Sequence, residues 1–320
     1  MADVADPPAE AAVPALGFAL PQSGSWATPA AVSRFAQAAE AAGYESLWTF
    51  QRLLYPADGQ WGEMYRQVHD PLITLAQVAT LTTRPRLGVA VLNMPYYSPV
   101  VLSKQLTTLD AVSDGRLDVG LGIGWAPEEL EAVGVPMSER GARAEEFVRC
   151  LEAIWDDDPV EFSGRFYRVP RSHVLPRPVQ RPHPPLLLGA TADPALRRVG
   201  RLADGWISAS RQDLREVGRA IGIIREAAKE AGRDPETLRF VIRGVTYLDE
   251  ERTGRDGARR LLSGSEEQIR QDLATLAGEG VTEVFLDPNF DTAVGNPDAD
   301  ARVAEARAMR LLETFAPAAG

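Results

Sequence analysis

The sequence predicts an α/β fold, a (β/α)8 TIM barrel with insertion loops at the C-terminal face. Eight short runs alternate with segments of helical period, and the runs are continuously apolar, as parallel strands under helices are. The 320 residues also suit a barrel of roughly 250 residues plus insertions. A doubly wound open sheet is the alternative arrangement of such elements. The expected strands span residues 15–20, 45–50, 86–91, 117–121, 185–189, 205–208, 238–243 and 282–286.

Start signals for helices follow several of these strands. Thr28 and Ser98 each precede a proline, and this pair supplies an N-cap and a first helical residue with a suitable φ. Ser138 is expected to cap the helix after the fourth strand, and Asp193–Pro194 is expected to start the helix after the fifth. His69 is interpreted as a helix cap rather than a catalytic group. Later helices are expected over residues 210–231, 264–278 and 297–314.

Composition excludes several classes of protein. A net charge of −11 argues against a general nucleic-acid binder, because neutralising phosphates needs a basic face. No run approaches the roughly 18 apolar residues of a membrane span, and three scattered histidines predict no metal site. The single cysteine, Cys150, suits a reducing cytoplasm. Residues 1–12 lack the basic character of a targeting peptide, so we expect a disordered tail before one domain over 13–320.

Three connections are too long to be simple turns, namely residues 51–68, 122–138 and 156–184. The first two follow strands and therefore belong at the C-terminal face, where the active sites of such barrels form. The third is expected to hold a small hairpin around residues 160–169.

The most informative stretch is Gly115–Trp125, in which Gly120, Gly122 and Gly124 alternate at the end of a strand. Glycines there allow a ligand to approach the backbone closely. The stretch is not a Rossmann fingerprint, because no helix starts directly after it. Tight packing inside the barrel is the alternative explanation of these glycines.

This stretch, together with residues 88–110, 176–207 and 264–287, resembles the luciferase-like monooxygenase family, and most closely its branch that uses the deazaflavin coenzyme F420. The similarity runs in register from about residue 15 to 287. The resemblance implies a TIM barrel that binds a flavin or deazaflavin at its C-terminal face, and commonly a homodimer.

The resemblance also implies residues that hold the ring of the cofactor. A cis peptide bond between Ala90 and Val91, at the end of the third strand, would form a bulge behind the ring. Gly122 and Gly124 would let the backbone approach it, and Trp125 would stack on a ring or shape an apolar pocket.

For the phosphate of the cofactor, the resemblance implies Gly189, Ala190 and Thr191, with Ser208 and Ala209. The first three lead into a helix whose free N–H groups and dipole suit an anion. The alternative is an ordinary helix start, capped by its own aspartate.

The sequence also departs from the family pattern. Many F420-dependent members carry Asp-His after the second strand, where this chain has Gln51 and Arg52. Trp125 stands where sugar-phosphate dehydrogenases of the family have Glu, so a sugar-phosphate substrate is not expected. Gln51 and Arg52 are therefore the candidate catalytic residues, with the role of orienting or polarising a substrate rather than transferring a proton.

Aromatic residues beside the expected mouth predict a hydrophobic organic substrate. Trp61 and Tyr65 lie in the first insertion, and Trp26 and Tyr96 each follow a strand. These side chains would line the substrate pocket; the alternative is that they pack the loops onto the barrel.

Taken together, the residues and the resemblance predict a cytoplasmic F420-dependent oxidoreductase that transfers a hydride to or from a small organic substrate. Reduction of a C=C or C=N bond suits a site poor in acids and bases, because the cofactor itself carries the hydride. Two alternatives remain: an FMN-dependent monooxygenase of the same family, and a non-catalytic flavin-binding barrel.

Overall fold

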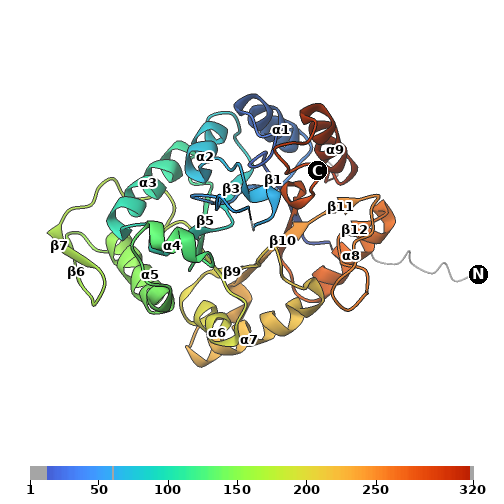
Figure 1. The fold of residues 1–320 in the computed structure, drawn as a ribbon. Coiled ribbons are helices and arrows are strands. Elements are labelled where there is room, and N and C mark those ends of the chain that lie inside the picture. Colours follow the sequence, from blue (N-terminus) through green and yellow to red (C-terminus); the bar gives the residue numbers. More distant parts are fainter. Residues whose placement is uncertain (1–12, 60, 318–320) are drawn as a thin grey trace, which may run out of the picture.

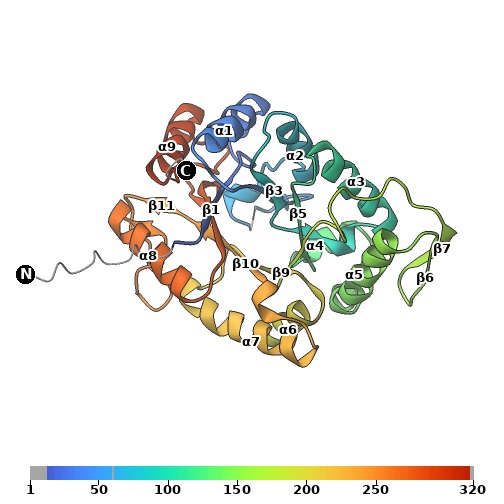
Figure 2. The ribbon, with the colours of Figure 1, turned by 180° about the vertical axis from the view of Figure 1, so that it is seen from behind.

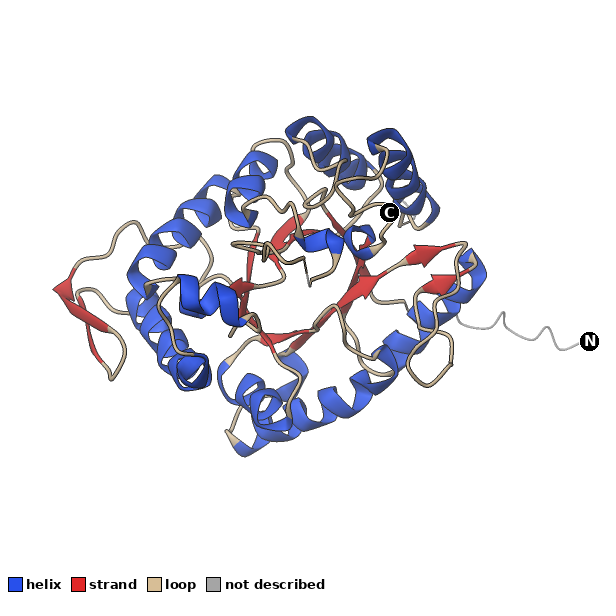
Figure 3. Cartoon of the chain, viewed as in Figure 1, coloured by secondary structure: helices blue, strands red, loops and turns tan. Residues whose placement is uncertain are grey.

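A closed barrel forms the centre of the molecule. The computed structural model describes residues 13–59 and 61–317, so the tail predicted over residues 1–12 lies outside the described part. Eight parallel strands of that part form a ring surrounded by helices, which confirms the predicted TIM barrel and excludes an open sheet (Figures 1 and 3). The strands are β1 (Ala15–Ala19), β2 (Ser46–Thr49), β3 (Arg86–Val89), β5 (Leu117–Gly122), β8 (Leu186–Gly189), β9 (Gly205–Ile207), β10 (Arg239–Val245) and β13 (Glu283–Asp287).

The hydrogen-bonded order of the strands is β3-β2-β1-β13-β10-β9-β8-β5, and the ring closes where β3 pairs with β5. This seam is short: Leu87 lies opposite Leu117, and Gly88 opposite Asp118. A two-residue strand, β4 (Leu92–Asn93), continues the pairing with the upper half of β5. Between β3 and β4 lies the peptide bond Ala90–Val91, which is cis, as the family resemblance implied.

Helices cover the outside of the ring. Thr28 caps α1 as predicted, because its hydroxyl accepts the N–H of Ala31 at 3.1 Å. Within the described residues no helix is long and apolar enough to cross a membrane. The outer helices are α1 (Pro29–Ala41), α2 (Pro71–Ala79), α3 (Pro99–Val112), α5 (Arg140–Asp156), α6 (Asp193–Leu202), α7 (Val217–Glu230), α8 (Glu266–Gly278) and α9 (Ala301–Thr314).

Two predicted caps were wrong, whereas the predicted start of α6 at Asp193–Pro194 is confirmed. Ser138 lies inside a 3-10 turn, Met137–Glu139, that precedes α5, and α5 has no side-chain cap. His69 does not cap α2 either, because the carboxylate of Asp70 accepts the N–H of Ile73 at 3.0 Å.

The predicted hairpin is present as β6 (Val160–Ser163) and β7 (Arg168–Ser172), an antiparallel pair that projects away from the barrel (Figure 2). Glu146 on α5 holds its turn, because the carboxylate accepts the N–H groups of Arg165, Phe166 and Tyr167. A further insertion after β10 was not predicted. It includes the short strands β11 (Tyr247–Leu248) and β12 (Ser263–Gly264).

Apolar side chains form two layers of core. The larger layer lies between strands and helices and includes Cys150 on α5, whose thiol is fully buried. Burial raises the pKa of that thiol to about 11. The smaller layer fills the inside of the ring, where Trp48 stacks on Phe285 with ring centroids 5.0 Å apart.

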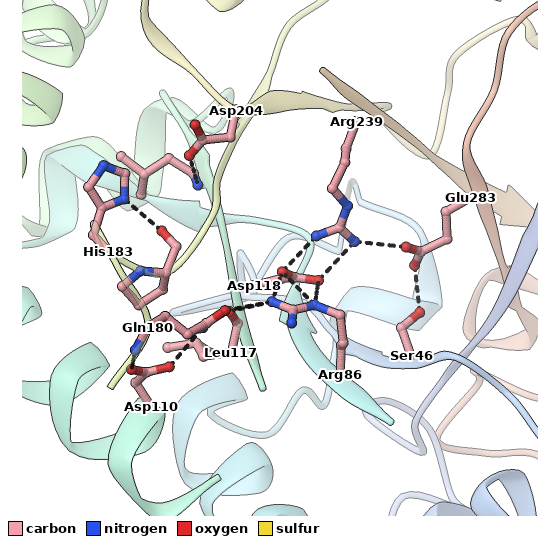
Figure 4. Close-up of polar contacts among 12 residues, drawn as sticks. Ser46, Arg86, Asp110, Leu117, Asp118, Gln180, His183, Asp204, Arg239 and Glu283 are labelled. Atoms are coloured by element: carbon pink, nitrogen blue, oxygen red, sulfur yellow. Dashed lines mark hydrogen bonds and ion pairs between the residues drawn. The ribbon is translucent and has the colours of Figure 1, made fainter. Parts of the chain in front are cut away.

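A network of charged side chains closes the barrel at the N-terminal ends of the strands (Figure 4). The fully buried carboxylate of Asp118 on β5 accepts hydrogen bonds from Arg86 on β3 at 3.0 Å and from Arg239 on β10 at 2.8 and 2.9 Å. Arg239 also donates to Glu283 on β13 at 2.9 Å, and Glu283 accepts the hydroxyl of Ser46 on β2. Burial raises the pKa of the Glu283 carboxyl, and the charge of Arg239 opposes that rise. The network therefore joins five of the eight strands.

We expect Asp118→Asn to destabilise the protein by about 3 kcal/mol, because two guanidinium groups would face each other without their shared counter-charge. The midpoint of urea unfolding measures this effect. Glu305→Gln is the control, since Glu305 pairs with Arg34 on the surface and such pairs contribute less than about 1 kcal/mol. Equal midpoints for the two variants would contradict a structural role of the network.

Candidate active site

The candidate site lies at the opposite end of the barrel, where the C-terminal ends of the strands meet three insertions. Residues 51–68 follow β2, residues 122–138 follow β5 and contain α4 (Pro127–Ala132), and residues 246–263 follow β10. The insertions after β2 and β10, with the loop after β9 and the turn after β13, enclose a cavity of about 190 Å³, which we call the mouth cavity. It is lined by Gly62, Met64, Tyr65, Ser210, Arg211, Val245, Tyr247, Arg260 and Phe290.

The glycines of β5 pack closely against the bulge that follows β3. A Cβ atom on Gly122 would lie 2.5 Å from the Val91 side chain, and one on Gly120 would lie 1.9 Å from the carbonyl oxygen of Val89. The packing explanation therefore accounts for both residues. Gly124 differs, because its φ of +74° is the left-handed conformation that glycine adopts readily, and it turns the chain toward Trp125.

Gln51 is buried and fixed at the bulge. Its amide oxygen accepts the N–H of Asn93 at 2.8 Å, and its amide nitrogen donates to the hydroxyl of Tyr97. Burial raises the pKa of Tyr97 to about 12, so its hydroxyl stays protonated near neutral pH. Gln51 therefore holds the segment after the cis peptide in place. Its predicted catalytic role stays a prediction, and these contacts suit a residue that positions the wall of the site.

Arg243, near the end of β10, was missed in the sequence. Its Nε donates to Asp287 at 2.6 Å, and its Nη1 donates to the carbonyl oxygen of Ala90 at 3.1 Å. The guanidinium carbon lies 4.3 Å from the ring centroid of Phe290 and 4.8 Å from that of Phe50. A charged residue at the C-terminal end of a predicted strand indicates a site residue in such barrels. Arg243 and Asp287 both stand at such ends, so this pattern could have indicated them.

Arg52 lies among three aromatic rings contributed by two insertions. Its guanidinium carbon is 4.7 Å from the ring centroid of Trp125, 4.9 Å from that of Tyr65 and 5.8 Å from that of Trp61. Nη1 donates to Glu129 on α4 at 2.9 Å. A guanidinium bound in this way joins the insertions after β2 and β5.

Glu129 is the second residue that the sequence did not indicate. Its carboxylate is fully buried and accepts the N–H of Leu53 at 2.7 Å and the hydroxyl of Tyr96 at 2.6 Å, in addition to Arg52. Burial, and then the bond to Glu129, raise the pKa of Tyr96. An acidic residue thus does lie close behind Trp125, but it is already bound to a cation and a phenol.

The predicted phosphate-binding residues do come together. Gly189 at the end of β8 lies opposite Ile207 of β9, which brings Gly189–Thr191 beside Ser208 and Ala209. The hydroxyl of Ser208 accepts the N–H of Arg243 at 2.9 Å. Within the described part of the chain, the N–H groups of Thr191 and Ala209 donate to no other residue.

The start of α6 has no side-chain cap, so the alternative explanation of this segment was wrong. Asp193 instead accepts the guanidinium of Arg219 at 2.8 and 2.9 Å. Within the described residues the N–H of Asp193 at the start of α6 donates to no other residue, and it lies at the positive end of the helix dipole, which suits an anion.

One predicted pocket residue was wrong. Trp26 is fully buried in the main core, where its ring lies edge-on to Phe35 with centroids 4.9 Å apart. Tyr65 does line the mouth cavity, and Trp61 lies behind it against Trp125 at 5.1 Å. Tyr96 points its hydroxyl at Glu129 and so supports the insertion after β5. No cluster of metal-binding side chains occurs among the described residues.

Comparison with known proteins agrees with this architecture. The family model described as luciferase-like monooxygenase matches residues 12–256. The chain belongs to the luciferase-like monooxygenase family. An uncharacterized protein of Mycobacterium tuberculosis is 29% identical to this luciferase-like protein over 94% of this chain and 98% of its own. The FMNH2-dependent dimethylsulfone monooxygenase of Pseudomonas putida is 31% identical over 62% of this chain and 53% of its own.

Solved structures show the same luciferase-like fold. Monooxygenase RslO1 from Streptomyces bottropensis has a TM-score of 0.75 at 21% identity and covers 94% of this chain and 98% of its own. The coenzyme F420-dependent tetrahydromethanopterin reductase from Methanopyrus kandleri has a TM-score of 0.73 at 17% identity and covers 95% and 98%.

In this luciferase-like protein we expect Glu129→Gln to loosen the two joined insertions, because Arg52 would lose its buried counter-charge. Proteolysis within residues 51–68 should become faster, and the tryptophan fluorescence should shift as the partly buried Trp61 gains access to water. Glu131→Gln is the matched control, since Glu131 is exposed on the same short helix. If both variants are cleaved at the wild-type rate, Glu129 does not hold the insertions.

Proposed function

We propose that this luciferase-like protein is an F420-dependent oxidoreductase that transfers a hydride between the deazaflavin and a small, hydrophobic organic substrate, with reduction of a C=C or C=N bond as the favoured reaction. One observation carries the proposal: the buried carboxylates beside the mouth, Glu129 and Asp287, are already paired with arginines. Glu129 binds Arg52, and Asp287 binds Arg243. A site whose acids are occupied suits a reaction in which the protein mainly binds and orients.

The donors on this side of the barrel fit an anionic cofactor. The N–H groups of Thr191 and Ala209 are free within the described residues, and α6 begins without a side-chain cap. Arg211 follows on the same loop as Ala209 and lines the mouth cavity. These groups would hold the phosphate, and the bound deazaflavin would supply a hydride.

The remaining residues have roles in orientation and in the exclusion of water. Tyr65, Val245 and Phe290 present apolar surface to the mouth cavity, which suits a flat ring or a hydrophobic substrate. Gln51 and Arg243 fix the bulge after β3 from two sides, through the N–H of Asn93 and the carbonyl of Ala90. A wall fixed in this way keeps the reacting groups in one geometry.

A specific observation favours a second candidate, an FMN-dependent monooxygenase. The relative from Pseudomonas putida, 31% identical over the matched region, is named an FMNH2-dependent enzyme. In its favour, a single phosphate would be satisfied by the same free N–H groups. The fold neighbours include F420-dependent and monooxygenase structures alike, so the cofactor has to be measured.

We expect purified protein to bind F420 more tightly than FMN. Titration of the tryptophan fluorescence, to which Trp61 and Trp125 beside the mouth contribute, measures both affinities. A substrate panel with reduced F420 then measures turnover. Equal or tighter binding of FMN, with consumption of oxygen by the reduced flavin, would replace this proposal with the second candidate. Binding of F420 without oxidation by any substrate would favour a non-catalytic barrel.

We expect Gln51→Ala to lower turnover about 5- to 30-fold, because the buried N–H of Asn93 loses its acceptor and the bulge is released. The loss should appear in kcat, with cofactor affinity nearly unchanged. Gln77→Ala is the control, since Gln77 makes comparable bonds to Pro29 and Ser33 between α1 and α2. An unchanged kcat would show that Gln51 does no more than pack.

A further inference from the structure

Tyrosine hydroxyl groups at the mouth of the barrel are, with one exception, engaged in hydrogen bonds. Those of Tyr55 and Tyr247 each donate to a backbone carbonyl oxygen, at 2.9 and 3.1 Å respectively. Those of Tyr96 and Tyr97 are bonded to side chains of other segments. Tyr65 is the exception: within the described residues its hydroxyl makes no hydrogen bond and remains accessible, and its side chain lines the mouth cavity. This phenol therefore keeps its proton free for a ligand.

The ring of Tyr65 is held firmly, although its hydroxyl is free. It lies edge-on to Phe290 with centroids 5.6 Å apart, and tilted against Trp125 at 6.0 Å. The guanidinium carbon of Arg52 lies 4.9 Å from the ring centroid. Tyr65 is only 6% exposed, so its neighbours leave the ring little room to move. A hydroxyl on a ring packed in this way has a defined position, which a group that transfers a proton requires.

The mouth cavity offers few other sources of a proton. Side chains that act as general acids in enzymes are those of histidine, aspartate, glutamate, lysine, cysteine and tyrosine. Of these types, the described residues that line the cavity include Tyr65 and Tyr247, and the proton of Tyr247 is bonded to the carbonyl oxygen of Phe290. The nearby carboxylates of Glu129 and Asp287 are buried and paired with arginines. Tyr65 is therefore the acid that faces a ligand in this cavity.

The surroundings of Tyr65 also suit the negative charge that forms when its proton leaves. Arg211 and Arg260 line the same cavity, and no carboxylate of the described residues forms an ion pair with either guanidinium. Arg52 faces the ring, and the attraction between a cation and an aromatic ring grows as the ring becomes negative. Positive groups that are already in place stabilise charge at the moment when it develops.

We propose that Tyr65 is the proton donor of the reaction, and thus a catalytic residue. This inference rests on the proposed function, in which the reduced deazaflavin supplies the hydride. One carbon of a C=C bond conjugated to an electron-withdrawing group takes the hydride, and the π electrons shift toward that group. The neighbouring carbon then forms a C–H bond with the hydroxyl proton of Tyr65, while the electron pair of the O–H bond stays on the phenol oxygen. Water returns a proton to the phenolate, and the cofactor is left oxidised.

The free hydroxyl can be tested without cofactor or substrate. N-acetylimidazole acetylates accessible phenol hydroxyl groups, and peptide mass spectrometry identifies the modified residues. In the unliganded protein we expect Tyr65 to be acetylated ahead of Tyr55, Tyr96 and Tyr247, because the hydroxyl groups of these three are already bonded. A Tyr65 that stays unmodified would show that its hydroxyl is closed to a ligand, and this result would overturn the proposal.

Tyr65→Phe removes the proton and keeps the ring. With cyclic enones and reduced F420, we expect this variant to lower kcat by about 100-fold or more, with KM and the affinity for F420 nearly unchanged. Tyr55→Phe is the matched control, since it removes a hydroxyl from the same insertion that is bonded to the backbone. Its kcat should stay close to that of the wild type. Circular dichroism and the unfolding midpoint confirm that both variants are folded.

Nitroalkenes separate the transfer of the proton from that of the hydride. A nitroalkene that has taken a hydride becomes a nitronate anion, which persists without immediate protonation and absorbs in the ultraviolet. We expect the wild type to release the nitroalkane. Tyr65→Phe should oxidise reduced F420 at nearly the wild-type rate but release the nitronate, because the hydride still arrives and the proton does not.

The outcomes distinguish the proton donor from the proposed function. Nitroalkane released by Tyr65→Phe as by the wild type, or an equal loss of kcat in Tyr55→Phe, would overturn Tyr65 as the donor and leave the proposed function intact. Failure of the wild type to oxidise reduced F420 with any of these enones and nitroalkenes would overturn both. Nitronate released by Tyr65→Phe, and not by Tyr55→Phe, supports the proposal.

Discussion

The seam between β3 and β5 is the constraint on which the barrel depends, because the ring closes there through two pairs of residues. At the N-terminal ends of the strands, the carboxylate of Asp118 accepts hydrogen bonds from both Arg86 and Arg239, so electrostatic attraction draws β3 and β10 toward β5. At the C-terminal ends of the strands, Gly120 and Gly122 allow Val89 and Val91 to approach the backbone of β5 closely. The position of the bulge, and with it the wall of the mouth, follows from this closure.

Above the seam the insertions are joined mainly to one another. Arg52 and Glu129 connect residues 51–68 with α4, and the ring of Trp125 contacts both Arg52 and Arg211 of the loop after β9. Trp125 is 42% exposed, so the contact with Arg211 is made at the surface. Breaking a contact at the surface costs less free energy than breaking one in the core. This side of the mouth is therefore suited to open and admit a ligand.

The strands were predictable from the sequence because each is a local apolar run, and the position of the cis peptide came from the family resemblance. The pairings at the mouth were not predictable, because Arg52 and Glu129 are 77 positions apart and Arg243 and Asp287 are 44 apart. Trp26 was predicted to line the substrate pocket but lies in the core. A tryptophan after a strand suits either a pocket or the core, and only the packing with Phe35 decides between them. Likewise, Asp193 has a typical capping position, but Arg219 competes for its carboxylate.

The burial of Cys150 has a practical consequence for work with this protein. The chain has one cysteine, and its thiol is enclosed by the core with a pKa of about 11, so little thiolate is present near neutral pH. A cysteine introduced on the projecting β6–β7 hairpin would then be the thiol that maleimide reagents modify. Dyes or surface linkers attached there would leave the mouth of the barrel accessible, which allows single-site labelling without removal of the native cysteine.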